Sequence, residues 1–204
     1  MEQVEQIRAA LKSHPVRMIE PGNRAHAAVA LIVNEQQDGL SILFIERSTN
    51  DNDYWSGQIG LPGGRVESCD RSLKETAERE TREEIGLDLA TAQYLGRLSD
   101  IAPGGLHIVI SCFIYAVKHL PALHLAREEI ADAFWVPVPE FNNPARLSQV
   151  EFVVRNRLRK FPALRVSDTK EQPLWGLTYR LLRNLNKAVQ RTINQYRLNH
   201  NEPR

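Results

Sequence analysis

The sequence predicts an α/β fold in one domain, and three observations support that prediction. The chain has 204 residues, which suits one domain with a few added elements. Hydrophobic residues make up 42% and charged residues 25%, a balance typical of folded globular proteins. Short apolar runs also alternate with segments of helical periodicity. We therefore expect residues 1–204 to form a single α/β domain that ends in a long helix.

Composition and charge exclude several classes of protein. Lys and Arg total 26 against 25 Asp and Glu, so the net charge does not indicate a nucleic-acid partner. The two cysteines, Cys69 and Cys112, lack the spacing of a zinc site or a disulfide framework and suit a reducing compartment. No secretory signal and no long apolar run occurs, so we expect a cytoplasmic location and no membrane contact.

The first elements follow from periodicity and from proline and glycine. Residues 2–13 have amphipathic helical spacing that ends before Pro15, so residues 1–15 are predicted to form a helical appendage. The apolar runs 27–33 and 41–46 flank a polar loop, which predicts a β-hairpin.

A glycine turn and a helix follow the hairpin. Residues 59–64 are predicted to lead from a short strand into the glycine turn. Ser72 and Glu75 have the spacing of a capping box, so a helix should begin there, continue to Ile85 and stop at Gly86. Further strands are predicted at 92–98, 108–117 and 134–138, with a charged loop at 127–129.

The last predicted element is an amphipathic helix over residues 176–197. Its apolar residues recur at helical spacing: Leu177, Leu181, Leu182, Leu185, Ala188, Val189 and Ile193. This stripe could lie in the domain core or at a dimer interface, and periodicity does not choose between them.

Three glutamates on the middle helix are the main candidates for chemistry. Each residue advances a helix by about 100°, so Glu80, Glu83 and Glu84 share one side. Clustered carboxylates repel one another unless a cation lies among them, and such oxygen ligands suit Mg²⁺ or Mn²⁺. Arg79 is four residues before Glu83 and can hold its carboxylate.

The opposite side of the same helix indicates how it is held. Ala77, Thr81 and Ile85 form a stripe that could face the sheet.

The charged side of this helix has two explanations. A solvated face with charge pairs along it is the usual explanation of a helix rich in Glu and Arg. The flanking glycines favour a site instead, because they allow backbone and helix to approach a ligand closely.

This segment resembles the signature of the Nudix hydrolase family. Gly64 and the run from Arg79 to Leu87 match the pattern. Asp70 stands where the family has Glu, one additional residue separates it from Arg79, and Thr81 replaces an aliphatic residue. The resemblance implies an α/β/α sandwich around a mixed sheet.

The resemblance also implies roles for individual residues. Glu80, Glu83 and Glu84 would bind the divalent metals, and Arg79 would orient a carboxylate. The Gly63-Gly64 turn would shape the loop against the substrate.

A narrower resemblance is to the coenzyme A pyrophosphatase branch of this family. It depends on Arg47-Ser48, on Gly57-Gln58 before the Pro-Gly-Gly turn, and on Trp175-Gly176-Leu177-Thr178. The segment from Thr49 to Ser56 departs from that branch in both length and composition.

Three further residues are candidates with two explanations each. Glu129, in the charged loop, could be a catalytic base or a solvated carboxylate. Arg47 could contact a phosphate or a structural carboxylate. Trp55 could stack on a base or pack in the core, and Trp135 and Trp175 are predicted to be packing residues.

The hypothesis that follows is metal-dependent hydrolysis of a diphosphate bond. A water activated by Mg²⁺ or Mn²⁺ and deprotonated by a nearby Glu would attack phosphorus in a nucleoside diphosphate derivative. Catalytic roles fall to Glu83, Glu84, Arg79 and Glu129, with coenzyme A as the expected substrate. ADP-ribose, nucleotide sugars or dinucleotides are alternatives, as is a non-catalytic nucleotide-sensing or protein-binding module. By resemblance the protein would form a homodimer.

Overall fold

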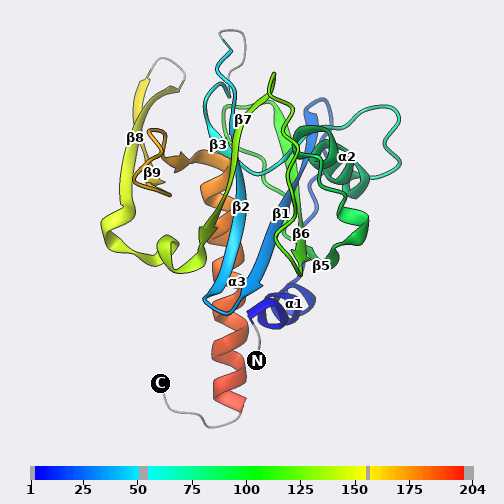
Figure 1. Cartoon of the computed structure of the whole chain (residues 1–204), viewed down its shortest axis with the longest axis vertical. Coiled ribbons are helices and arrows are strands. Elements are labelled where there is room, and N and C mark those ends of the chain that lie inside the picture. Colours follow the sequence, from blue (N-terminus) through cyan, green and yellow to red (C-terminus); the bar gives the residue numbers. More distant parts are fainter. Residues whose placement is uncertain (1–2, 51–54, 155–156, 200–204) are drawn as a thin grey trace.

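A computed structural model describes residues 3–50, 55–154 and 157–199 of the chain. Its central feature is a seven-stranded mixed sheet between helices (Figure 1). β1 and β6 run parallel, whereas the other pairings in this sheet are antiparallel. The strands are β1 (Ala25–Gln36), β2 (Gly39–Arg47), β3 (Ile59–Gly60), β4 (Gly63–Arg65), β5 (Gln93–Arg97), β6 (Ile108–Val117) and β7 (Ile130–Pro137). The predicted α/β class and mixed sheet are confirmed.

The predicted hairpin of β1 and β2 opens into a wedge. The two strands pair from Gln36 opposite Gly39 to Val33 opposite Ile42. Farther from the turn, β1 pairs with β4 and β2 pairs with β3, so residues 59–65 lie between the two strands. Ala30 donates its backbone N–H to the Pro62 carbonyl at 2.9 Å. The glycine turn is thereby held in the middle of the sheet.

Helices cover both faces of the sheet. They are α1 (Gln3–Ser13), α2 (Leu73–Ile85) and α3 (Gly176–Asn199), with 3₁₀ turns η1 (Leu89–Thr91), η2 (Val138–Asn142) and η3 (Pro144–Arg146). All three predicted helices are confirmed within the described residues, which exclude residues 1–2 and 200–204. The strand predicted at 92–98 is preceded by η1, and β7 begins four residues before the predicted strand 134–138.

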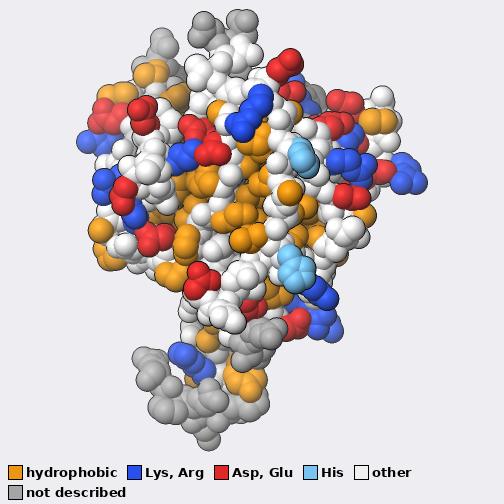
Figure 2. All heavy atoms as spheres, in the orientation of Figure 1, with side chains coloured by type: hydrophobic (Ala, Val, Ile, Leu, Met, Phe, Trp, Pro, Cys, Tyr) orange, Lys and Arg blue, Asp and Glu red, His pale blue; other side chains and the backbone are white. Residues whose placement is uncertain are grey.

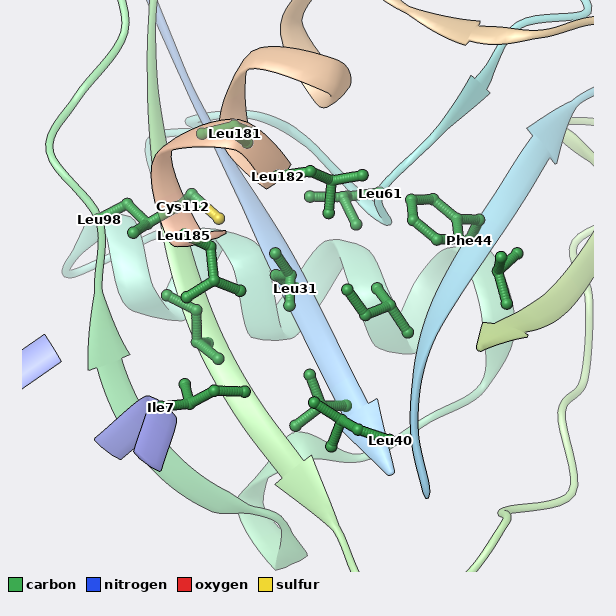
Figure 3. Close-up of a cluster of buried hydrophobic side chains, with 14 of the residues drawn as sticks. Ile7, Leu31, Leu40, Phe44, Leu61, Leu98, Cys112, Leu181, Leu182 and Leu185 are labelled. Carbon is green, nitrogen blue, oxygen red and sulfur yellow. The ribbon is translucent and has the colours of Figure 1, made fainter. Parts of the chain in front are cut away.

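Alternating residues of β1 supply the two sides of the core. Leu31 and Val33 join a buried cluster with residues of α1 and α3, whereas Ala30 and Ile32 join a cluster with residues of α2. Figure 3 shows Leu181, Leu182 and Leu185 of α3 over Leu31 and Cys112, with α2 behind the sheet. Over the first turns of α3, its apolar stripe is therefore buried in the core of this chain. Of the two alternatives, the domain core and a dimer interface, the core accounts for this part of the stripe.

A second, three-stranded sheet stands beside the first (Figure 1). It consists of β8 (Leu147–Val154), β9 (Arg157–Leu164) and β10 (Leu174–Trp175), all antiparallel. The sequence patterns predicted no element here. β10 leads directly into α3, so this sheet is tied to the start of the long helix.

The surface carries charges of both signs. Figure 2 shows acidic and basic side chains interspersed around an apolar area on one face. Among the described residues, no helix has the length and apolar character needed to cross a lipid bilayer.

Candidate active site

A cavity of about 410 Å³ lies where residues 59–65 meet α2 and the start of α3. Ligand sites commonly measure roughly 300–1,000 Å³. The structure brings most predicted site residues into its lining: Arg47, Trp55, Gly63, Gly64, Glu80, Glu84 and Glu129. Arg79 and Glu83 are not part of this lining. Residues 51–54 of the altered segment lie outside the described part of the chain.

A second cavity of about 450 Å³ lies between α1, α3 and the end of the hairpin. Its lining is mainly apolar, with Arg183 and Lys187 as its cations and no carboxylate among the described residues. Only the first cavity therefore combines acidic side chains with a glycine turn.

Glu84 is the most deeply buried carboxylate of the site. Its side chain is 2% exposed, and it accepts a hydrogen bond from the Gly63 N–H at 2.9 Å. Arg47 reaches it at 3.4 Å. Burial raises the pKa of Glu84 to about 8, helped by the charges of Glu80 and Glu129 and opposed by Gly63 and Arg47. A positive charge in the cavity would favour its ionised form.

Glu80 lies one helical turn before Glu84 and faces the same cavity. Burial raises its pKa above the ordinary value, the nearby Arg79 lowers it, and the charges of Glu83 and Glu129 raise it further. Gly64 lies directly against this carboxylate, because a Cβ at Gly64 would overlap the Glu80 side chain. Gly63 is equally constrained, since its φ of 145° and the adjacent Ala28 carbonyl leave no room for a side chain.

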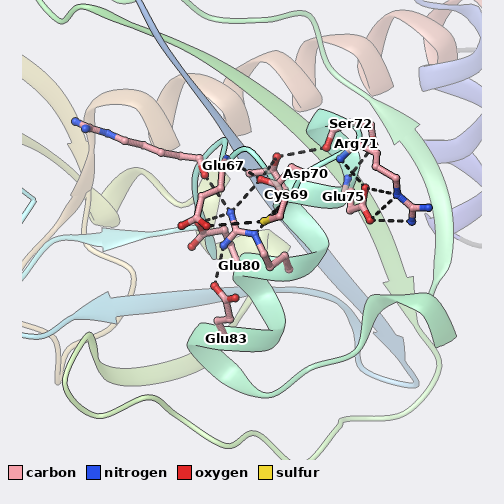
Figure 4. A network of polar contacts seen from close by, with 11 residues as sticks. Glu67, Cys69, Asp70, Arg71, Ser72, Glu75, Glu80 and Glu83 are labelled. Atoms are coloured by element: carbon pink, nitrogen blue, oxygen red, sulfur yellow. Dashed lines mark hydrogen bonds and ion pairs between the residues drawn. The ribbon is translucent and has the colours of Figure 1, made fainter.

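Arg79 binds several carboxylates, and Figure 4 labels three of them: Asp70 of the loop before α2, and Glu80 and Glu83 of the helix. Its guanidinium donates to Asp70 at 2.9 Å and 3.1 Å, and to Glu83 at 2.8 Å. It also lies 3.0 Å from Glu80. The predicted pairing of Arg79 with Glu83 is confirmed, and Glu83 itself is 58% exposed.

Asp70, which replaces the family glutamate, has a defined structural role. Its side chain is 1% exposed and also accepts hydrogen bonds from the Thr76 hydroxyl and the Glu67 N–H. The hydrogen bond from Arg79 holds the pKa of Asp70 well below its ordinary range. Asp70 therefore anchors the arginine that contacts Glu80 and Glu83.

The ends and the buried side of α2 hold these groups in place. Ser72 caps the helix by accepting the Glu75 N–H at 3.2 Å, whereas the Glu75 carboxylate binds the Arg71 N–H instead of closing the predicted capping box. Gly86 ends the helix with a φ of 70°. The predicted stripe toward the sheet is confirmed, since Ala77, Thr81 and Ile85 are fully buried.

The departure from the family pattern at position 81 has a local explanation. Thr81 replaces an aliphatic residue and is fully buried. Its hydroxyl donates to the Ala77 carbonyl at 2.6 Å, so the polar group is satisfied within the helix.

The carboxylates of the cavity fit a divalent cation by their charge. Glu80, Glu84 and Glu129 line one cavity, and the charges of Glu80 and Glu129 add to the electrostatic cost of ionising Glu84. Among the described residues, no three acidic, His or Cys side chains already stand in a metal-binding arrangement. The donors are hard oxygen atoms with excess negative charge, which is the combination that Mg²⁺ and Mn²⁺ neutralise.

Aromatic side chains form further parts of the cavity wall. Trp55 lines the cavity, which supports the binding explanation over core packing. Trp175 was predicted to be only a packing residue; it packs on Phe152 and Phe161 and also lines the cavity. The sequence signal for this position was its place in the Trp-Gly-Leu-Thr segment, since Thr178 lines the cavity too.

Comparison with known proteins agrees with the fold. The NUDIX domain model matches residues 23–156. A Schizosaccharomyces pombe protein described as uncharacterized is 30% identical over 161 residues, which cover 69% of this chain and 49% of that protein. The chain thus spans about half the length of that relative. The Nudix hydrolase NudL of Yersinia enterocolitica, also described as uncharacterized, is 28% identical over 83% of this chain and 86% of its own.

A solved structure supports the fold alone. A MutT/nudix family protein from Enterococcus faecalis superposes with a TM-score of 0.53 and 13% identity, over 93% of this chain and 75% of the other. The match of the family model covers all seven strands of the main sheet and all of α2. The chain therefore belongs to the NUDIX family.

Proposed function

We propose that the protein uses Mg²⁺ or Mn²⁺ to hydrolyse the diphosphate bond of coenzyme A or its derivatives. The products would be adenosine 3′,5′-bisphosphate and 4′-phosphopantetheine. The observation that carries the proposal is the buried Glu84, which faces the same cavity as Glu80 and Glu129 beside a glycine turn.

The residues of α2 would hold the cation. Glu80 and Glu84 point their carboxylates into the cavity, and Glu83 is the neighbouring exposed carboxylate bound to Arg79. A bound divalent cation would polarise water and neutralise charge on the phosphate oxygens. Arg79, anchored by Asp70, would keep Glu80 and Glu83 oriented.

Glu129 is the proposed general base. Its loop is tied to the end of β2, because the Ser48 N–H donates to the Glu129 carbonyl at 2.8 Å. Glu129 is exposed, yet it lines the cavity, and its charge acts on both Glu80 and Glu84. A carboxylate that near the metal-binding residues is suitably placed to take a proton from water.

The walls of the cavity supply groups for a nucleotide. Trp55 and Trp175 offer aromatic faces on which a base can stack. Arg47, a cation at the end of β2, contacts Glu84 and can also bind a phosphate group.

Coenzyme A is the proposed substrate because residues from the separate segments that resemble the coenzyme A pyrophosphatase branch line the same cavity. Arg47 and Gln58 come from neighbouring segments and Thr178 from a distant part of the sequence, and all three line this one cavity. ADP-ribose, nucleotide sugars and dinucleotides share the diphosphate and remain the alternative substrates. The acidic cavity disfavours a purely sensing module, which needs no such excess of carboxylates.

A substrate panel tests the proposal. Purified protein is incubated with Mg²⁺ or Mn²⁺ and with coenzyme A, ADP-ribose, NADH or a nucleotide sugar, and phosphate-containing products are identified. We expect metal-dependent cleavage of coenzyme A that EDTA abolishes. Faster cleavage of another substrate would retain the chemistry and reject coenzyme A, and no cleavage of any would reject the proposal. A homodimer stays a prediction, which light scattering would check.

A further inference from the structure

One face of the second sheet carries an aromatic cluster followed by two arginines. Side chains two residues apart in a strand share a face, so Arg157, Arg159, Phe161 and Ala163 of β9 lie on the same side. Trp175 of β10 pairs directly with Ala163 and therefore belongs to that side as well.

This face is continuous with the candidate active site. Trp175 lines the cavity, and its ring lies 5.7 Å from the Phe161 ring and 5.1 Å from the Phe152 ring. Arg159 stands directly opposite Phe152 in the β8–β9 pairing. The face thus leads from the cavity wall through the aromatic rings to Arg159 and then to Arg157.

The charges of these two arginines are uncompensated in the described part of the chain. Both side chains are exposed, and no described carboxylate forms an ion pair with either. Other cations of the region are engaged: Arg146 binds Glu140 at 2.7 Å, and Lys160 binds Glu151 at 3.4 Å on the opposite face of the hairpin.

We propose that Arg157 and Arg159 form an anion subsite that binds a phosphate group beyond the diphosphate. The substrate class would then be nucleoside diphosphate derivatives that carry an additional phosphomonoester, with the base or sugar against the aromatic rings. Guanidinium groups suit this ligand because they make paired, charge-assisted hydrogen bonds to phosphate. The inference rests on the proposed function of the neighbouring cavity and extends it to substrate selection.

Pairs of substrates that differ by one phosphate test the subsite. The pairs are coenzyme A with 3′-dephospho-coenzyme A, and NADPH with NADH. We expect the double variant Arg157→Gln/Arg159→Gln to lower kcat/KM for the phosphate-bearing member by about tenfold or more, mainly through KM. The other member of each pair should change by less than about twofold, because it lacks the group that the arginines bind.

Lys160→Gln is the matched control. Lys160 follows Arg159 in the same strand but lies on the opposite face, so this variant should leave both members of each pair unchanged. An equal loss for both members in the double variant, or an equal loss in Lys160→Gln, would overturn the subsite.

A binding measurement separates failure of the subsite from failure of the proposed function. If the wild-type protein cleaves none of these substrates, the proposed hydrolysis fails while the subsite can still be judged. Tryptophan fluorescence then follows the binding of adenosine 3′,5′-bisphosphate and of adenosine 5′-monophosphate. Preference for the bisphosphate that disappears in the double variant supports the subsite, and equal affinity of the wild-type protein for both overturns it.

Discussion

Two groups of acidic side chains in and around helix α2 differ in how their charge is balanced. The Arg79 network consists of Arg79 with Asp70 and Glu83, joined by hydrogen bonds of 2.8 Å to 3.1 Å. The cavity carboxylates are Glu80, Glu84 and Glu129, of which Glu84 meets a cation only at 3.4 Å. Asp70 and Glu83 thus receive short hydrogen bonds from Arg79, whereas Glu84 has only the longer contact with Arg47; Glu80, 3.0 Å from Arg79, is shared by the two groups.

The pKa values of two buried carboxylates express this difference. Arg79 keeps the pKa of Asp70 well below its ordinary value, whereas burial raises the pKa of Glu84 to about 8. Removing one partner of the buried Asp70–Arg79 pair should destabilise the fold, whereas burial opposes the ionisation of Glu84 until a divalent cation binds. Replacing single acids by their amides tests this contrast.

Glu84→Gln should have the largest effect on activity. We expect turnover to fall by about a thousandfold, since one buried metal-binding carboxylate is removed. Stability in EDTA should not fall, because the amide oxygen can still accept the Gly63 N–H. Steady-state kinetics and urea unfolding measure the two effects. Near-normal turnover would refute a metal-binding role for Glu84.

Glu83→Gln should lower turnover by about a hundredfold, if its carboxylate joins the metal site. Its side chain is 58% exposed, so stability should change by no more than about 0.5 kcal/mol. The same assays apply. Unchanged turnover would restrict Glu83 to the Arg79 network.

Asp70→Asn should act mainly on stability. The amide removes the charge that faces Arg79. We expect the free energy of unfolding, measured in urea, to fall by about 2–4 kcal/mol. Turnover should fall less than in Glu84→Gln, because Arg79 loses its anchor but the cavity carboxylates remain. A variant as stable as the wild-type protein would show that the Arg79 network is not stabilising.

Acid should weaken the same network. The folded-state pKa of Asp70 lies below its ordinary value of 3.8, so the unfolded chain takes up a proton there at a higher pH than the folded chain does. The stability that Asp70 contributes is therefore present above about pH 4 and is lost as the pH falls below it. Urea unfolding at pH 7 and at pH 3.5 should show the gap between wild type and Asp70→Asn narrowing; a constant gap would contradict this linkage.

Glu78→Gln should have the smallest effect and serves as the control on the same helix. Glu78 accepts hydrogen bonds from Lys74 at 2.6 Å and Tyr115 at 3.0 Å, away from the cavity lining. The amide oxygen can keep both, so stability should change by about 0.5 kcal/mol and turnover by less than about twofold. A large loss of turnover would mean that any charge change on α2 disturbs the enzyme.

Local patterns predicted the elements of the main sheet and its helices well. The span of α2 follows from its serine cap, its terminal glycine and the buried stripe of Ala77, Thr81 and Ile85, all of which act within a few residues. No such signal marks β8 and β9, because much of β9 is exposed and its strands are defined by their pairing with each other.

By itself the sequence determined that three glutamates share one side of a helix that follows a glycine turn, because helical geometry depends only on spacing. Only the tertiary structure decided that Glu80 and Glu84 face a cavity while Glu83 faces solvent and Arg79. It alone decided that Asp70 anchors Arg79 and that Trp175 joins the cavity to the second sheet. Burial and charge balance depend on groups that are distant in sequence, so no local pattern contains them.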